Sequence, residues 1–167
     1  MGCWGMGITQ SDEYCEVYER FLEDYDSGML VADISKNILE EYQQEFDEND
    51  GILHDVYFAL GKAQWMCGGI SDDLFHRIRQ IIESGENLTF LRELGASDKD
   101  LIIRKRKLDL FLQGLSTPRG KTRKRKLSKK QVITESVVVF PNIHIGDVFS
   151  VIFDFAAGGG NEAGNSL

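Results

Sequence analysis

The sequence predicts a mostly α-helical protein: a compact multi-helix bundle, followed by a basic linker and a small C-terminal β element. Three observations predict this fold class. Apolar residues recur at steps of three and four through most of residues 1–117, which is the period of an amphipathic helix. Residues that cap helices or form turns separate these stretches. Only residues 131–155 change to short runs of β-branched and aromatic residues.

The first helix is expected directly after Ser11, a residue type that caps helix N-termini, with acidic residues in its first turn. Its apolar stripe is formed by Tyr14, Val17, Tyr18, Phe21, Leu22 and Tyr25. After a turn at residues 26–28, a second helix is expected at about residues 34–46. Its apolar positions are Ile34, Ile38, Tyr42 and Phe46.

The third helix, at about residues 52–67, is the most apolar segment and is expected to lie at the centre of the bundle. Asn49 or Asp50 is expected to cap it. The loop before it does not match a calcium-binding loop. Placing Gly51 at the required glycine position would make the apolar Phe46 the first ligand.

Three further helices complete the predicted bundle. A fourth begins after a cap at Ser71, and a short fifth surrounds residues 88–94. A sixth runs from a capping box formed by Ser97 and Asp100 to about Leu115.

The chain is expected to divide into an acidic helical domain at 1–117, a basic linker at 118–130, a β-rich segment at 131–155 and a flexible tail at 156–167. The β-rich segment holds two strand-like runs. Two strands alone are marginally stable in water. We therefore expect this segment to be part of an incomplete domain, or to pack on the helical body or on another copy of the chain.

Charge is distributed very unevenly along the chain. Residues 1–100 hold 22 acidic and 7 basic side chains, a balance of −15, whereas residues 101–130 have a balance of +11. In the first two helices the acids recur at helical steps away from the apolar stripes. They predict an anionic, partner-binding face that consists of Asp12, Glu16, Glu19, Glu23, Asp26, Glu40, Glu41 and Glu45. A surface that only keeps the protein soluble is the alternative.

The basic tract concentrates six positive charges in eight residues: Arg119, Lys121, Arg123, Lys124, Arg125 and Lys126. A segment of this kind is expected to stay solvated and sensitive to proteases. It can be a linker, a localisation-like tract, or an arm that contacts DNA phosphates without reading the sequence. An intramolecular contact between the arm and the acidic body is a further interpretation.

The sequence contains few features that are typical of an enzyme. His54, His76 and His144 lie far apart, and no Cys or His spacing is typical of a zinc site. No phosphate-binding loop or nucleophile turn is present. We therefore expect no catalytic residue, cofactor or metal.

The chain is expected to be cytoplasmic. Its opening residues lack the pattern of a signal peptide, so none is expected, and no apolar run approaches the ~20 residues of a membrane span. The three cysteines are an odd number at long spacings, which favours reduced thiols. Cys15 and Cys67 are expected to pack in the core.

The opening residues resemble the start of a family of bacterial proteins marked by M-G-x-W-G-x-G and a following acidic helix. The matching residues are Met1, Gly2, Trp4, Gly5, Gly7 and Asp12. Members of this family are similar to immunity proteins, which block a toxin by direct binding. Residues 1–126 also resemble proteins of gut bacteria and their mobile elements, among them phage-type anti-CRISPR inhibitors of RNA-guided nucleases.

These resemblances and the acidic helices together imply a non-enzymatic inhibitor. Its acidic face would act as a DNA mimic in the basic groove of a nucleic-acid-processing enzyme, an RNA-guided DNA nuclease, and its basic arm would touch DNA. An immunity protein that neutralises a toxin, and a scaffold or assembly module, are the alternatives. No membrane partner is expected, and the oligomeric state is open.

Overall fold

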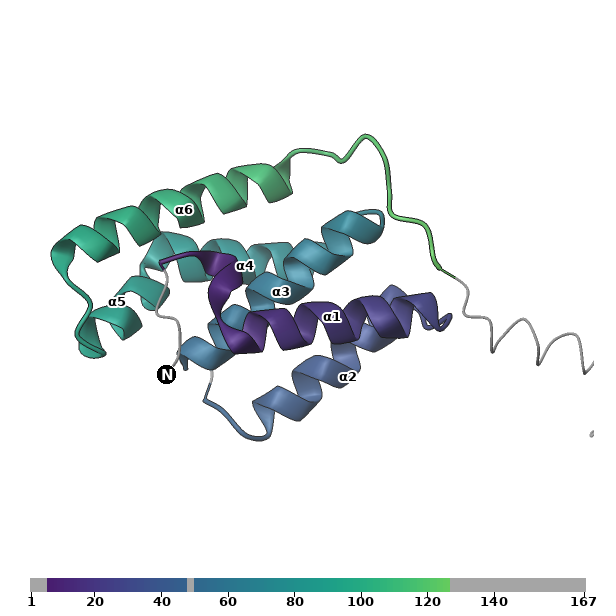
Figure 1. Ribbon diagram of the computed structural model, residues 1–167, viewed down its shortest axis with the longest axis horizontal. Coiled ribbons are helices and arrows are strands. Elements are labelled where there is room, and N and C mark those ends of the chain that lie inside the picture. Colours follow the sequence, from purple (N-terminus) through teal and green to yellow (C-terminus); the bar gives the residue numbers. More distant parts are fainter. Residues whose placement is uncertain (1–5, 48–49, 127–167) are drawn as a thin grey trace, which may run out of the picture. The chain divides into compact units, whose positions relative to one another are not determined.

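The computed structural model describes residues 6–47 and 50–126, and these fold into a bundle of six helices (Figure 1). A 3-10 turn, η1 (Ile8–Gln10), precedes α1 (Asp12–Asp26), α2 (Val31–Gln43), α3 (Gly51–Cys67), α4 (Asp72–Ser84), α5 (Glu86–Glu93) and α6 (Asp98–Ser116). The prediction of a mostly α fold is therefore confirmed. The expected β-rich segment at 131–155 and the tail lie outside the described residues.

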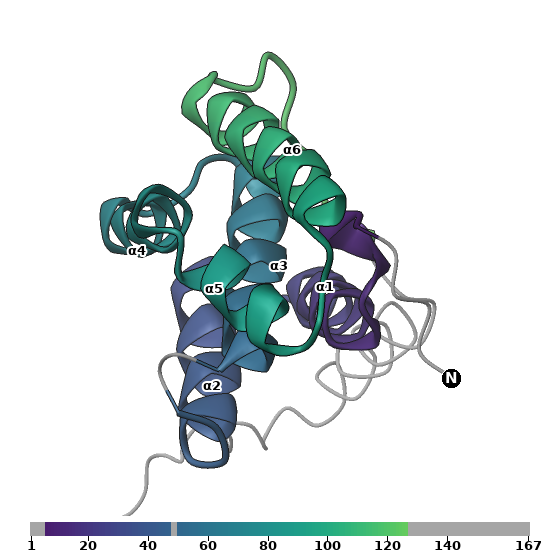
Figure 2. The same cartoon turned by 90° about the vertical axis from the view of Figure 1, so that its left-hand side faces the viewer.

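The apolar helix α3 forms the centre of the bundle, as its composition predicts. It packs against α1, α2, α4, α5 and α6, and Figure 2 shows these helices arranged around it. Phe58 of α3 meets Phe111 of α6 edge to face, with the ring centroids 5.7 Å apart. The fully buried apolar side chains of α3 are Leu53, Val56, Phe58, Ala59, Leu60 and Ala63.

Most of the predicted helix caps are present. Ser11 and Asp50 accept hydrogen bonds from the first turns of α1 and α3, at 3.1 and 2.8 Å. Ser97 accepts from the Asp100 N–H at 3.2 Å and donates to its carboxylate at 2.7 Å. Ser71 stands at the N-cap position of α4, but its hydroxyl makes no capping bond, so that part of the prediction was wrong.

Helix α2 begins and ends three residues earlier than predicted, at Val31 and Gln43. Phe46 lies in the turn that follows, where its N–H donates to the Tyr42 carbonyl at 2.9 Å. Its ring also stacks on that of Tyr42, with centroids 6.2 Å apart. Phe46 therefore continues the apolar spacing of α2 although it lies beyond the end of the helix. Because the prediction relied on this spacing alone, it placed the helix too far along the chain.

Gly61 lets α3 approach α4 closely. A Cβ atom at this position would collide with the Ile78 side chain and would lie 3.3 Å from Ile70 and 3.5 Å from Leu115. Ile78 is fully buried, so its methyl group has no solvent-filled space into which it can move. The contact between the two helices thus requires a residue without a side chain.

Replacement of Gly61 by Ala is expected to lower the free energy of unfolding by about 1–3 kcal/mol, because the added methyl group overpacks this contact. Gly114 is the matched control: it lies exposed in α6, and a Cβ there meets no atom within 4 Å. Gly114→Ala should raise the stability by up to about 1 kcal/mol through its higher helix propensity. Urea unfolding measures both changes, and equal stabilisation by the two substitutions would contradict the close contact.

Candidate functional site

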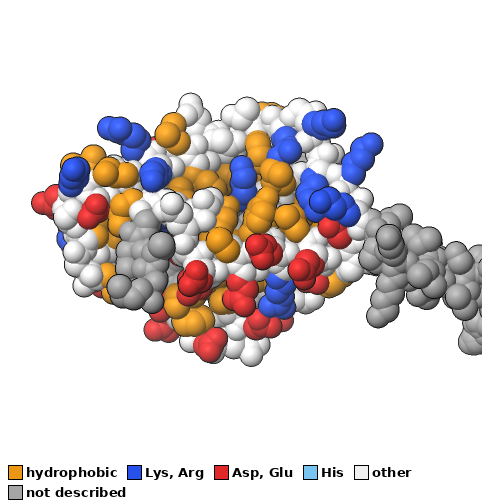
Figure 3. Space-filling view, viewed as in Figure 1, with side chains coloured by type: hydrophobic (Ala, Val, Ile, Leu, Met, Phe, Trp, Pro, Cys, Tyr) orange, Lys and Arg blue, Asp and Glu red, His pale blue; other side chains and the backbone are white. Residues whose placement is uncertain are grey.

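The acidic residues predicted to bind a partner lie on α1, α2 and the turn after α2. Those exposed at the surface are Asp12, Glu16, Glu19, Glu23, Glu40, Glu41 and Glu45. Together α1 and α2 hold ten acidic and two basic side chains. In Figure 3 most of the acidic side chains gather over these two helices, whereas most of the basic ones lie over α6 and the segment after it. We call this surface of α1 and α2 the acidic face.

Some carboxylates of the acidic face already have partners within the chain. Arg20 of α1 pairs with Glu41 of α2 at 2.7 Å, and a lysine one turn away lies 3.7 Å from Glu40. Glu16 accepts a hydrogen bond from the Tyr42 hydroxyl at 3.1 Å. Within residues 6–47 and 50–126, the predicted carboxylates without an ion pair or hydrogen-bond partner are Asp12, Glu19, Glu23 and Glu45.

A shallow depression of about 270 Å³ lies in the acidic face. Four carboxylates line it together with two aromatic rings and one aliphatic side chain: Glu13, Glu16, Glu41, Glu45, Tyr42, Phe46 and Ile52. Burial is the main cause that raises the pKa of Tyr42 to about 12, and the hydrogen bond to Glu16 is the second cause. The Tyr42 hydroxyl therefore stays a proton donor at neutral pH and adds no further charge to the depression.

The basic segment after α6 is docked onto the bundle, and we call residues 117–126 the strap. Arg123 donates two hydrogen bonds to the Asp26 carboxylate, at 2.7 and 2.9 Å. The Lys126 N–H donates a third at 2.9 Å. These bonds, those of Arg123 foremost, lower the pKa of Asp26 to about 2. Along the backbone, the Arg123 N–H donates to the Met66 carbonyl at 2.8 Å.

Aromatic rings support the rest of the strap. The Trp65 indole N–H donates to the Thr117 carbonyl at 2.8 Å, and the guanidinium of Arg119 lies 5.2 Å from the Trp65 ring centroid. The Arg125 guanidinium lies 4.1 Å from the ring centroid of Tyr25. Cation–π contacts at such distances contribute about 0.5–1 kcal/mol each at partly exposed sites.

The docked strap differs from the expectation of a solvated linker. It is the intramolecular contact between arm and body that the charge pattern had left open. Asp26, expected on the partner-binding face, is instead occupied by the strap. Of the six basic side chains proposed to contact nucleic acid, Arg119, Arg123 and Arg125 are half-buried. The exposed ones are Lys121, Lys124 and Lys126.

A second site is centred on Arg104 of α6, which is only 6% exposed. Its Nε donates to Asn87 Oδ1 of α5 at 2.9 Å, and Nη1 donates to the Gly7 carbonyl at 3.1 Å. Its Nη2 lies 3.5 Å from the Asp55 carboxylate of α3. Burial raises the pKa of Asp55 to about 6, although Arg104 opposes this shift. The Asp55 carboxylate is thus ionised at neutral pH, and Arg104 together with a hydrogen bond from the Ser11 hydroxyl offsets only part of the cost of its burial.

His54 extends this cluster into the core. Its ring is fully buried, and Nδ1 lies 3.4 Å from Asn87 Nδ2. Because Asn87 accepts from Arg104 through its oxygen, its amide NH₂ faces His54, and the imidazole proton belongs on Nε2. Nε2 has no hydrogen-bond partner among the described residues, and Glu86 lies 3.9 Å away. Burial lowers the pKa of His54 to about 4, so the ring is neutral at pH 7.

A cavity of about 390 Å³ opens beside Arg104, between the start of α1 and helices α3, α5 and α6. Its polar lining includes Asp55, Asn87 and Arg104, and its apolar walls come mainly from Ile52, Phe90, Leu91 and Leu94. Glu13 and Ile52 line both this cavity and the depression in the acidic face. The two sites are therefore neighbours on the molecule.

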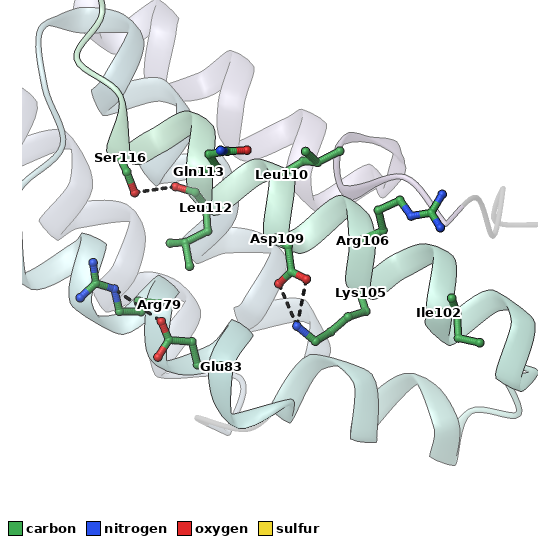
Figure 4. A pocket seen from close by; sticks show the side chains of 10 residues that line it. All are labelled: Arg79, Glu83, Ile102, Lys105, Arg106, Asp109, Leu110, Leu112, Gln113 and Ser116. Carbon is green, nitrogen blue, oxygen red and sulfur yellow. Dashed lines mark hydrogen bonds and ion pairs between the residues drawn. The ribbon is translucent and has the colours of Figure 1, made fainter.

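A larger groove, of about 750 Å³, lies between α4 and α6 (Figure 4). It includes the exposed Ile102 and Leu110, at 64% and 60%. Several of its charges are paired within their own helices: Arg79 with Glu83 at 3.7 Å, and Lys105 with Asp109 at 2.8 Å. The groove therefore has less unbalanced charge than the acidic face.

Sequence reasoning missed the Arg104 cluster. The signal was present, since Arg104 occupies the position between Leu101 and Leu108 in the apolar repeat of α6, where a charged residue requires buried partners. His54 likewise falls within the apolar pattern of α3. Cys15 is exposed, contrary to the expected core packing, whereas Cys67 is partly buried.

No family model, curated protein or solved structure was found to match this chain. The resemblances drawn from its opening residues and from residues 1–126 therefore stay predictions. Among the described residues, no group of three or more His, Cys, Asp or Glu side chains is arranged to hold a metal ion. Within the same residues, no helix is both long and apolar enough to cross a membrane.

Asp26→Ala is expected to release the strap, because the substitution removes the acceptor of three hydrogen bonds. Loss of charge-assisted bonds of this kind, at about 1.5–3 kcal/mol, should speed trypsin cleavage within residues 119–126 about tenfold. Limited proteolysis read by mass spectrometry measures the rate. Asp24→Ala is the control, since its carboxylate makes no ion pair in the described part of the chain. Equal cleavage rates in both variants would show that Asp26 does not hold the strap.

Asp55 and His54 are expected to give opposite pH dependences of stability. The pKa of Asp55 is raised from 3.8 to about 6, so its contribution is full below pH 3.8 and is lost as the pH rises through 6. The pKa of His54 is lowered from 6.5 to about 4, so its contribution is full above pH 6.5 and is lost as the pH falls through 4. The two effects largely cancel in the wild type.

Single substitutions separate these effects. In Asp55→Asn the free energy of unfolding should rise by about 2–3 kcal/mol from pH 4 to 6.5, because the lowered pKa of His54 is no longer offset by the raised pKa of Asp55. In His54→Gln it should fall by a similar amount over the same range. Urea unfolding at several pH values measures both slopes. Slopes of the same sign in the two variants would refute the assignment.

Proposed function

We propose that this protein is a non-enzymatic inhibitor that binds a nucleic-acid-processing enzyme by presenting its acidic face to a basic groove. The observation that carries the proposal is the exposure of Asp12, Glu19, Glu23 and Glu45, none of which has a partner among the described residues. A groove that binds nucleic acid presents Lys and Arg to phosphates, and carboxylates on two adjacent helices offer the same groove an alternative set of charges. An RNA-guided DNA nuclease is the first candidate target.

The position of the strap is compatible with this proposal. Its contacts with α1 are at Tyr25 and Asp26, in the last turn of the helix. Four acidic side chains on the preceding turns of α1 remain exposed: Asp12, Glu16, Glu19 and Glu23. The strap could contact DNA mainly through its three exposed lysines, so it would neutralise few phosphates. The acidic face is therefore the principal binding surface in this proposal.

Capture of partners from the host by the immobilised protein separates the proposal from its alternatives. Recovery of a nuclease supports the inhibitor, whereas recovery of a co-encoded toxin supports an immunity protein. Recovery of neither would favour an assembly role for the chain.

Substitution of Glu16, Glu19 and Glu23 by Gln together should slow association with the captured partner about tenfold at low salt and change dissociation little, because long-range attraction acts mainly on the encounter. The matched control is Asp72→Asn, Asp73→Asn and Glu93→Gln, which removes the same charge from exposed positions of α4 and α5. Surface plasmon resonance at two salt concentrations measures both variants. Unchanged association of the α1 variant would remove this helix from the interface.

A further inference from the structure

We infer that the cavity beside Arg104 binds an organic cation: a primary ammonium group on an apolar stem. At about 390 Å³, the cavity falls in the size range of small-ligand sites. It combines apolar walls with a few polar groups that are held in place by the fold, which is the usual composition of such sites. The inference stands independently of the proposed inhibitory function.

The charge of the lining favours a cation. Glu13, Asp50, Asp55 and Arg104 line the cavity, and together they carry a charge of −2 when ionised. Arg104 does not offer a free guanidinium to an anion, because its nitrogens already bond to the Gly7 carbonyl, to Asn87 and to Asp55. An anionic ligand would also face the carboxylates.

Asp55 is the group that an ammonium would satisfy. Its contact with Arg104, at 3.5 Å, is longer than the ~2.7–2.9 Å of a strong charged hydrogen bond. Only 16% of the side chain is exposed, so water provides little further solvation. Asp55 also accepts a hydrogen bond from the Ser11 hydroxyl, so its close donor is neutral and its cationic neighbour is distant. A largely buried carboxylate in this position gains from a cationic donor at hydrogen-bond distance. The Asp55 carboxylate is therefore the expected contact of the ammonium group.

The walls of the cavity fit an apolar stem. Ile52 comes from α3, whereas Phe90 and Leu91 come from α5, and Leu94 follows at the end of that helix. The Phe90 ring packs directly onto Gly51, at a point where a Cβ atom would collide with it. This contact holds one aromatic wall in a defined position. Leu94 is 53% exposed and marks the side of the cavity that is open to solvent.

Two sources could supply this chemistry: a small free amine, or a lysine side chain of a bound protein. Titration of the full chain, followed by ¹H–¹⁵N NMR at pH 7, tests the inference with phenethylamine, with 3-phenylpropionate and with Nα-acetyl-lysine methylamide. Phenethylamine should give saturable shifts at the amides of Ile52, Asn87 and Leu91, whereas 3-phenylpropionate should not. Tighter binding of the lysine derivative would assign a protein side chain as the source, and tighter binding of phenethylamine would assign a small amine.

Variants test the role of the carboxylates. Asp55→Asn should weaken phenethylamine binding about tenfold, because a charged hydrogen bond is lost. Glu13→Gln, which leaves the buried cluster intact, should weaken it several-fold and keeps the test valid if Asp55→Asn does not fold. Glu19→Gln is the control on the same helix outside the cavity and should bind as the wild type does. Three results would overturn the inference. They are equal shifts with 3-phenylpropionate, shifts that do not saturate, and equal losses of phenethylamine affinity in Glu13→Gln and Glu19→Gln.

Discussion

The burial of one guanidinium is the constraint on which this bundle depends. Arg104 joins the chain before η1, the first turns of α3 and α5, and α6, through its bonds to Gly7, Asp55 and Asn87. Removing a charge from water costs several kcal/mol unless its donors are matched by acceptors. The four segments must therefore meet in one register, and a shift of any of them would leave a buried charge without its partners. The apolar packing around α3 is compatible with small shifts of one helix along another, whereas the hydrogen bonds of the Arg104 cluster are not.

The separation of charge on the surface follows from the same arrangement of helices. Helices α1 and α2 present their apolar stripes to α3, so their acids are placed side by side on the outside. The strap brings six basic residues along the C-terminal ends of α3 and α1, where Asp26 and the rings of Trp65 and Tyr25 hold three of them. Its attachment satisfies one carboxylate and leaves the rest of the acidic face open. The strap thus occupies the last turn of α1, and the proposed partner-binding carboxylates of this helix lie on the turns before it.

The acidic face and the cavity share a border. Glu13 and Ile52 line both, so a protein docked on the face would lie next to the opening of the cavity. Both surfaces are rich in carboxylates, and both are complementary to cationic groups. In contrast, His54 is shielded from solvent and lacks a hydrogen-bond partner for Nε2 within the described residues. The carboxylates of both surfaces are therefore the groups on which the two proposed binding sites rest.

The sequence by itself determined the helices and the side of each that is buried. Ser11 and Ser97 lie within three residues of the groups they cap, and the apolar steps of α1 and α3 act over one or two turns. Such local bonds and periods can be read directly along the chain. The tertiary structure alone decided that Arg104 meets Asp55, 49 residues away, and that Arg123 meets Asp26, 97 residues away. Many acids could have paired with either arginine. The packing of α6 against α3 brings Arg104 to Asp55, and the docking of the strap at the end of α1 brings Arg123 to Asp26.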